Sequence, residues 1–306
     1  MKGTDDANRL GLVRWLTDPG HPLTSRVMVN RLWQMCFGRG LVRTTEDFGS
    51  QGESPSHPAL LDWLSMSFIE SGWDIRKLIK TIVTSATYRQ DSVSSPALLE
   101  KDPENRLLGR GRRYRLSAEV IRDNALASSG LLVRKVGGAP VRPYEVTVSF
   151  KPMKRDKGEG LYRRSLYTFW KRTAPAPVMM ALDASKREVC TVRRERTASP
   201  LQALVLMNDP QLVEAARILG QEMLKKHADN SAAMLDEMFR ILTGRHPGKS
   251  EKDILARLHR EQLEFFEANA ENAKAFLKTG DAAADTNLAP ARLAAAGAVA
   301  NVLLNF

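Results

Sequence analysis

The spacing of apolar residues in the first ninety positions predicts short helices separated by proline and glycine. Residues 24–37 run without a helix breaker and end at Gly38, a residue suited to a left-handed helix cap. Pro58 favours the start of a second helix, and Asp74 is placed to cap a third. The apolar stripe of the second helix repeats every four residues at Leu60, Leu64 and Phe68. We therefore predict a helical subdomain over residues 1–90.

The rest of the chain also favours helices, which begin at capping residues and keep apolar stripes. Asp209 and Pro210 interrupt one helix and start the next, whose stripe continues through Leu212, Ala216, Leu219 and Met223. Residues 290–306 are rich in alanine, leucine and valine, so we expect a buried final helix there. Other helices are expected to begin near Ser117, Ser199, residue 231 and residue 251.

One segment shows the alternation typical of strands. Val146, Val148 and Phe150 alternate with polar residues, and residues 161–170 are rich in aromatic and β-branched side chains. The loop 151–160 would join them. The predicted fold is therefore mainly α, a multi-helix globular domain with one small β-hairpin near residues 145–170.

Composition is compatible with this architecture and narrows the class of protein. The chain has 306 residues, of which 43% are hydrophobic and 26% are charged, which is ordinary globular usage. We expect the helical subdomain 1–90, a serine- and proline-rich linker at 91–105 and a basic helical region at 106–306, with one continuous domain as the alternative. We expect no membrane span, because no run of about 18 apolar residues lacks polar interruptions. The sequence as given also begins without the apolar stretch of a secretory signal.

The positive charge is concentrated in the middle of the chain. The formal net charge is +11, and residues 106–196 carry 22 basic and 8 acidic side chains, 16 of the basic ones being arginine. Arginine forms bidentate bonds to carboxylate, phosphate or sulfate, and it also tolerates burial in ion pairs. Three interpretations stay open: a solvated basic face, a polyanion-binding face, and buried structural arginines. The candidate ligand-binding residues are Asn30, Arg31, Arg112, Arg113 and Arg194.

The loop between the first two predicted helices carries the clearest candidate for chemistry. Four titratable side chains lie within twelve positions there, close in sequence to Asn30 and Arg31: Glu46, Asp47, Glu53 and His57. Carboxylates beside an imidazole can act as general acid and base or hold a divalent metal. Asp47, His57 and Glu53 are the catalytic candidates, and Glu46, Asp47 and His57 are the metal candidates. A packed loop in which His57 is a hydrogen-bonding residue is the alternative.

Other chemistries find less support in the sequence. Cys190 lies among basic residues that would lower a thiol pKa, but no histidine is near in sequence. A buried small hydrophobic cysteine is therefore favoured over a nucleophile or a disulfide with Cys36. Basic and aromatic residues also occur together in two segments, 112–115 and 162–170, which is one pattern of nucleic-acid contacts. Their alternation suits core packing better, so nucleic acid is disfavoured.

Several long motifs in a fixed order resemble those of a planctomycete family. They include Asn30-Arg-Leu-Trp33, Phe37-Gly-Arg-Gly-Leu-Val42, Gly52-Glu-Ser-Pro-Ser-His-Pro58, Ser85-Ala-Thr-Tyr-Arg-Gln90, Asp102-Pro-Glu-Asn-Arg106, Arg163-Arg-Ser-Leu-Tyr167, Pro200-Leu-Gln-Ala-Leu204 and Asn208-Asp-Pro210. The chain is similar over nearly its whole length to the domain of unknown function fifteen fifty-three, also called planctomycete secreted domain one. It departs from the family pattern at Ala198 and over residues 145–160. Members of the family continue past the position of Phe306 with an acidic pair, so we expect that the C-terminus of this chain is trimmed.

This resemblance implies a setting for the protein and no activity. It implies a periplasmic or extracellular location within a larger parent protein that often contains a cytochrome-c-like domain. The chain has no Cys-x-x-Cys-His, so we expect no haem bound by this chain, while a divalent metal stays a candidate cofactor.

Two functions follow as hypotheses. The first is a non-catalytic helical module that binds an anionic ligand or docks the other domains of its parent protein. The second is a hydrolase or lyase that acts on an anionic glycan through the loop from Glu46 to His57.

Overall fold

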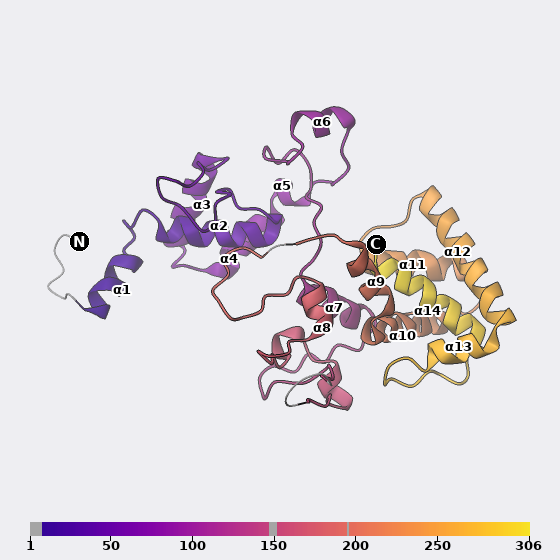
Figure 1. The fold of residues 1–306 in the computed structure, drawn as a ribbon. Coiled ribbons are helices and arrows are strands. Elements are labelled where there is room, and N and C mark those ends of the chain that lie inside the picture. Colours follow the sequence, from indigo (N-terminus) through magenta and orange to yellow (C-terminus); the bar gives the residue numbers. More distant parts are fainter. Residues whose placement is uncertain (1–7, 147–151, 195) are drawn as a thin grey trace. The chain divides into compact units, whose positions relative to one another are not determined.

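The computed structural model describes residues 8–146, 152–194 and 196–306, and this part of the chain is mainly helical, as predicted (Figure 1). The chain divides into two compact units, residues 1–114 and 115–306. The predicted linker at 91–105 belongs to the first of these units. The first unit contains α1 (Arg9–Thr17), α2 (Thr24–Phe37), α3 (Pro58–Glu70), α4 (Ile75–Thr84), α5 (Ala86–Arg89) and α6 (Pro96–Lys101). The second contains α7 (Ala118–Ser128), α8 (Pro177–Ala181), α9 (Pro200–Asn208), α10 (Pro210–His227), α11 (Ser231–Thr243), α12 (Lys249–Ala268), α13 (Ala270–Leu277) and α14 (Pro290–Leu304).

Helices α2, α3 and α4 enclose the core of the first unit. The sequence signals that start and stop these helices act as expected: Gly38 adopts the left-handed conformation after α2, and the Asp74 side chain accepts a hydrogen bond from the backbone of Lys77 at the start of α4. Their inward stripes meet in one cluster that also includes Leu41 and Val42 from the following loop. Burial of these two residues fixes the start of the loop that leads to α3.

The core of the second unit lies between α10, α11, α12 and α14, and α10 and α14 run side by side in Figure 1. Their backbones touch where Gly220 faces Gly297, because a Cβ on Gly220 would lie 2.7 Å from the Gly297 nitrogen. The alanine-rich sequence around Gly297 makes this approach feasible, since small side chains let helix backbones pack closely. The final helix is buried, as its apolar composition predicts.

The predicted β-hairpin near residues 145–170 is not supported, because the described residues contain no strand. Isolated bridges join Val141 to Thr168 and Val146 to Met153, and residues 147–151 lie outside the part described. The segment expected as the second strand forms two short 3₁₀ turns instead, at Gly158–Leu161 and Ser165–Tyr167. Side chains of α7 form hydrogen bonds to this segment, and these tertiary contacts outweigh its local strand propensity.

The described helices include none that is long and apolar enough to cross a membrane.

Candidate functional site

Asn30 shapes the loop that was expected to carry chemistry. Its buried side chain donates to the Val42 carbonyl at 3.0 Å and accepts from the Val42 backbone N–H at 2.9 Å. This double hydrogen bond fixes the chain after α2 much as a strand partner would. Gly40 is required beside it, since a Cβ there would lie 2.5 Å from the Val42 carbonyl oxygen. Asn30 therefore positions the loop backbone and is not exposed to a ligand.

The titratable side chains of the loop do not gather into an acid–base or metal site. Asp47 accepts a hydrogen bond from the Gly49 backbone at 2.7 Å and so closes a turn. His57 lies at the start of α3, where its Nδ1 is 3.0 Å from the Ser56 hydroxyl. Glu46 and Glu53 are exposed. Within the described residues, no three histidine, cysteine or acidic side chains come close enough to hold a metal ion.

Arg31, which was expected to lie against this loop, is exposed on α2, and none of the ion pairs in the described residues includes it.

A different set of side chains forms the candidate site of the first unit, which we call the arginine cleft. It is a small cleft lined by four arginines and two glutamates: Arg39, Arg43, Arg106, Arg112, Glu53 and Glu104. Nη1 of Arg39 and Nη1 of Arg43 each lie 3.2 Å from the same oxygen, Oε2 of Glu104. One carboxylate oxygen is therefore shared by two guanidinium groups, and the cleft keeps a formal charge of +2.

Arg112 is the one half-buried arginine among the four that line the arginine cleft. Its side chain is half-buried, it has a 3.4 Å hydrogen bond to the Asn105 carbonyl, and its buried Nε has no hydrogen-bond partner among the described residues. Burial lowers the pKa of the Arg112 guanidinium, and repulsion from the Arg39 cation lowers it further. A bound anion would offset the repulsion between these like charges, because guanidinium groups bind anions through charge-assisted hydrogen bonds.

The loop that carries Arg106 and Arg112 is built by its own polar side chains. The buried Asp102 carboxylate accepts from the backbone N–H groups of Arg106 and Leu107 at 2.7 and 2.8 Å. Arg110 closes the same loop by donating to the carbonyls of Asp102 and Pro103. Arg110 is therefore structural, although it belongs to the basic run that was expected to bind polyanions.

The cavity volume limits what can enter the arginine cleft. About 30 Å³ is available, more than the roughly 10–15 Å³ that one bound water needs. A single oxyanion group that projects from a larger molecule, such as a sulfate or phosphate ester or a carboxylate, can place an oxygen there.

Sequence reasoning found two residues of this cleft, Arg112 and Glu53, and missed Arg39, Arg43, Arg106 and Glu104. The four missed residues lie in two separate motifs, Phe37 to Val42 with Arg43 just after it, and Asp102 to Arg106. Nothing in the spacing shows that these segments meet. The signal that was present is the pair of arginines four residues apart in the loop after α2.

The basic middle of the chain is largely engaged in internal contacts. Arg194 is an exposed predicted ligand residue, but its Nη1 lies 2.8 Å from Glu119. Arg113 is exposed and donates to the Ser92 hydroxyl at 3.3 Å. Arg115 donates to Asp183 at 2.5 Å. These contacts favour the interpretation of structural arginines for much of residues 106–196.

Two buried arginines of the second unit, Arg122 and Arg163, have most of their donors engaged, although the Nε of Arg163 has no partner among the described residues. Arg122 donates to the Gln211 side chain at 2.6 Å, to the Leu161 and Arg163 carbonyls at 2.7 and 2.8 Å, and to the Ser165 hydroxyl at 3.1 Å. Arg163 donates to three backbone carbonyls between residues 135 and 139, and its guanidinium stacks on Tyr167 with 3.9 Å to the ring centre. Neither is available to a ligand.

The aromatic residues of residues 162–170 are similarly engaged. The Tyr162 hydroxyl bonds to Glu214 at 2.8 Å, and the Trp170 indole donates to the Lys186 carbonyl at 2.9 Å. Arg187 lies over the Trp170 ring. These contacts agree with the expectation that the basic and aromatic residues here pack internally.

The two cysteines are free and are not joined in a disulfide. Burial raises the pKa of the Cys36 thiol, which favours the protonated form. Cys190 is exposed.

Comparison with known proteins gives a family and no characterised relative. The family model PSD1, described as "Protein of unknown function (DUF1553)", matches residues 8–259. No curated protein and no solved structure matches the chain. The match covers both the arginine cleft and most of the second unit, and it agrees with the motifs quoted above. The chain belongs to the PSD1 family.

Proposed function

We propose that the chain is a non-catalytic helical module that binds an anionic group through the arginine cleft. The observation that supports this most directly is the shared carboxylate: Arg39 and Arg43 both contact one oxygen of Glu104, while Arg112 beside them has an unpartnered buried Nε. The cleft thus holds more guanidinium donors than acceptors. An oxyanion restores this balance.

The size and charge of the cleft specify the kind of ligand. A small group with several acceptor oxygens suits a narrow cleft lined by guanidinium groups, because one of its oxygens can enter while the others accept from the rim. Sulfate esters, phosphate esters and uronic carboxylates of an extracellular polymer all present such a group. We propose that an anionic glycan is bound at one of these substituents.

The setting of the module follows from the family resemblance. We propose a periplasmic or extracellular location within a larger parent protein, whose other domains, including a cytochrome-c-like domain, are candidate docking partners. The alternative of a hydrolase or lyase acting through Asp47 and His57 gains no support from the geometry of that loop, because each side chain bonds to a neighbour in its own turn.

Calorimetric titration of the whole chain with inorganic sulfate, phosphate and a sulfated disaccharide tests the proposal. We expect saturable binding that weakens as salt rises, because partly exposed ionic contacts are screened. Arg43→Met should weaken binding at least about tenfold, as expected for a lost charge-assisted hydrogen bond. Arg31→Met is the matched control, since Arg31 is an exposed arginine outside the cleft. Equal losses in the two variants, or no saturable binding of any of the three anions, would refute the proposal.

A further inference from the structure

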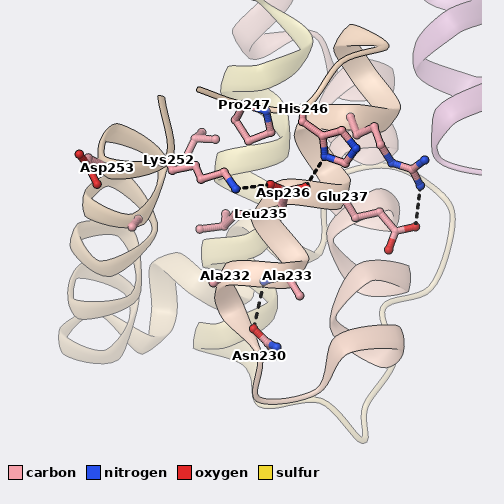
Figure 2. Close-up of a pocket in the computed structure, with 13 residues that line it drawn as sticks. Asn230, Ala232, Ala233, Leu235, Asp236, Glu237, His246, Pro247, Lys252 and Asp253 are labelled. Atoms are coloured by element: carbon pink, nitrogen blue, oxygen red, sulfur yellow. Dashed lines mark hydrogen bonds and ion pairs between the residues drawn. The ribbon is translucent and has the colours of Figure 1, made fainter. Parts of the chain in front are cut away.

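The second unit contains a larger cleft between α11 and α12 (Figure 2). We call it the α11–α12 cleft. Its volume of about 690 Å³ lies within the usual range for small-molecule sites, about 300–1,000 Å³. It shares no residue with the arginine cleft, so an inference about it is independent of the function proposed above.

The walls of the α11–α12 cleft are apolar and built from short side chains. Ala232, Ala233 and Leu235 line it from α11, and Leu255 and Ala256 line it from α12. Alanines on both helices leave room between the backbones that larger residues would fill. The apolar part of a ligand would be removed from water there, which is favourable in proportion to its area.

Two of the three carboxylates at this cleft are already paired. Figure 2 shows Asp236 between Lys252 and His246, and its two oxygens lie 2.8 Å from Lys252 Nζ and 2.8 Å from His246 Nδ1. Hydrogen bonds from Lys252 and His246 lower the pKa of Asp236, so it stays ionised. Glu237 is held in the same way by Lys226 and His227, each at 2.5 Å.

The donors at the cleft retain free capacity. Lys252 has three N–H groups and uses one on Asp236. Arg240 makes only a 3.9 Å contact with Glu237. The Asn230 oxygen caps α11 by accepting from Ala233, which leaves its amide N–H₂ for another partner. The remaining acidic residue, Asp253, points away from Asp236 in Figure 2.

We propose that the α11–α12 cleft binds a small amphiphilic organic anion. Its apolar body would lie against the alanine and leucine walls. Its single carboxylate or sulfonate would accept a hydrogen bond from Lys252, which keeps two N–H groups beyond the one used on Asp236. The combination of apolar walls, two occupied carboxylates and unused donors favours this class over a polyanion, which would gain nothing from the apolar walls.

Octanoate and 1-octanol distinguish this site from a general affinity for hydrocarbon. Calorimetric titration of the whole chain should show one octanoate bound per chain and at least about tenfold weaker binding of 1-octanol, because the alcohol lacks the charge that strengthens the hydrogen bonds. Lys252→Met should weaken octanoate binding about tenfold. Lys249→Met, on the exposed first turn of α12, should leave it unchanged.

Filling the cleft tests its location. Ala233→Trp should abolish octanoate binding, and Ala256→Trp, from the opposite wall, serves as a second filling variant should the first fail to fold by circular dichroism. Octanoate binding that survives in a folded filling variant would overturn the proposal. So would equal affinities for octanoate and 1-octanol, or no octanoate binding in the unmodified chain.

Discussion

Two arginines of the first unit, Arg39 and Arg43, differ from two of the second, Arg122 and Arg163, in the number of acceptors that surround them. In the second unit, Arg122 and Arg163 are buried and each donates to several carbonyl or side-chain oxygens. In the first unit, Arg39 and Arg43 share one oxygen of Glu104. The number of basic residues is therefore a poor guide to anion binding. What distinguishes a binding arginine from a structural one is whether the fold supplies its acceptors.

The same comparison separates stability from binding. Removing an arginine whose acceptors are buried leaves those acceptors without a donor, which destabilises the fold. Removing an arginine of the cleft reduces the repulsion between guanidinium groups and leaves few acceptors without a donor. We therefore expect variants of the second unit to lose stability and variants of the first unit to lose affinity.

The largest effect is expected for Arg122→Ala. The Leu161 and Arg163 carbonyls and the Gln211 side chain would lose a buried donor, and the free energy of unfolding should fall by about 3–5 kcal/mol. Urea denaturation followed by far-ultraviolet circular dichroism measures this. Arg164→Ala is the matched control, because Arg164 is exposed and its contact with Asp123 is a long one, at 3.8 Å. A loss for Arg122→Ala no greater than the control's would contradict the structural role.

Asn30→Ala should destabilise the first unit by about 1–3 kcal/mol, because both buried backbone groups of Val42 would lose their partner. Four of the five tryptophans, Trp15, Trp33, Trp63 and Trp73, lie in this unit, so tryptophan fluorescence during urea unfolding reports on it. The same variant should also weaken anion binding, since Arg39 and Arg43 flank the fixed segment. Unchanged stability would show that the loop does not depend on the two hydrogen bonds between Asn30 and Val42.

A pH-dependent effect is expected at Asp183. Burial tends to raise the pKa of this carboxyl, but hydrogen bonds from Thr197 and Gln202, together with Arg115, lower it below its usual value. A lowered pKa in the folded state stabilises the protein above pH about 4, and this stability is lost as pH falls through the folded pKa. Asp183→Asn should cost about 1 kcal/mol at pH 7 and should make stability less sensitive to acid. Identical acid-unfolding profiles would contradict this.

His57→Ala should have the smallest effect, a loss of about 0.5 kcal/mol. The imidazole is half-buried and its one hydrogen bond is to the adjacent Ser56. The melting temperature, which the packed-loop hypothesis expects to fall, should fall only slightly, and anion binding should be unchanged. An unchanged melting temperature together with lost binding would instead restore His57 as a site residue.

The sequence predicts the helices well and the site poorly, for physical reasons. Helix limits follow from local signals such as Gly38, Asp74 and Asp209, whose conformations and caps depend on a few neighbouring atoms. The hairpin prediction failed because Ser165 is held by Arg122 and Asp123, which lie about forty residues away and leave no trace in local alternation. The arginine cleft depends likewise on the meeting of two distant segments. Arg112 could be named from its basic run, but its neighbours Arg39 and Glu104 could not.

The central claim is that anions bind in the arginine cleft and not along the remainder of the basic middle of the chain. The most direct test is the dissociation constant for sulfate, measured by calorimetry at fixed low salt, in the unmodified chain, in Arg112→Gln and in Arg194→Gln. Both arginines belong to the basic region, but Arg112 has an unpartnered Nε while Arg194 is paired with Glu119. We predict that Arg112→Gln weakens binding at least about tenfold and that Arg194→Gln leaves it unchanged. Equal weakening in both variants, or a loss in Arg194→Gln alone, would contradict the account.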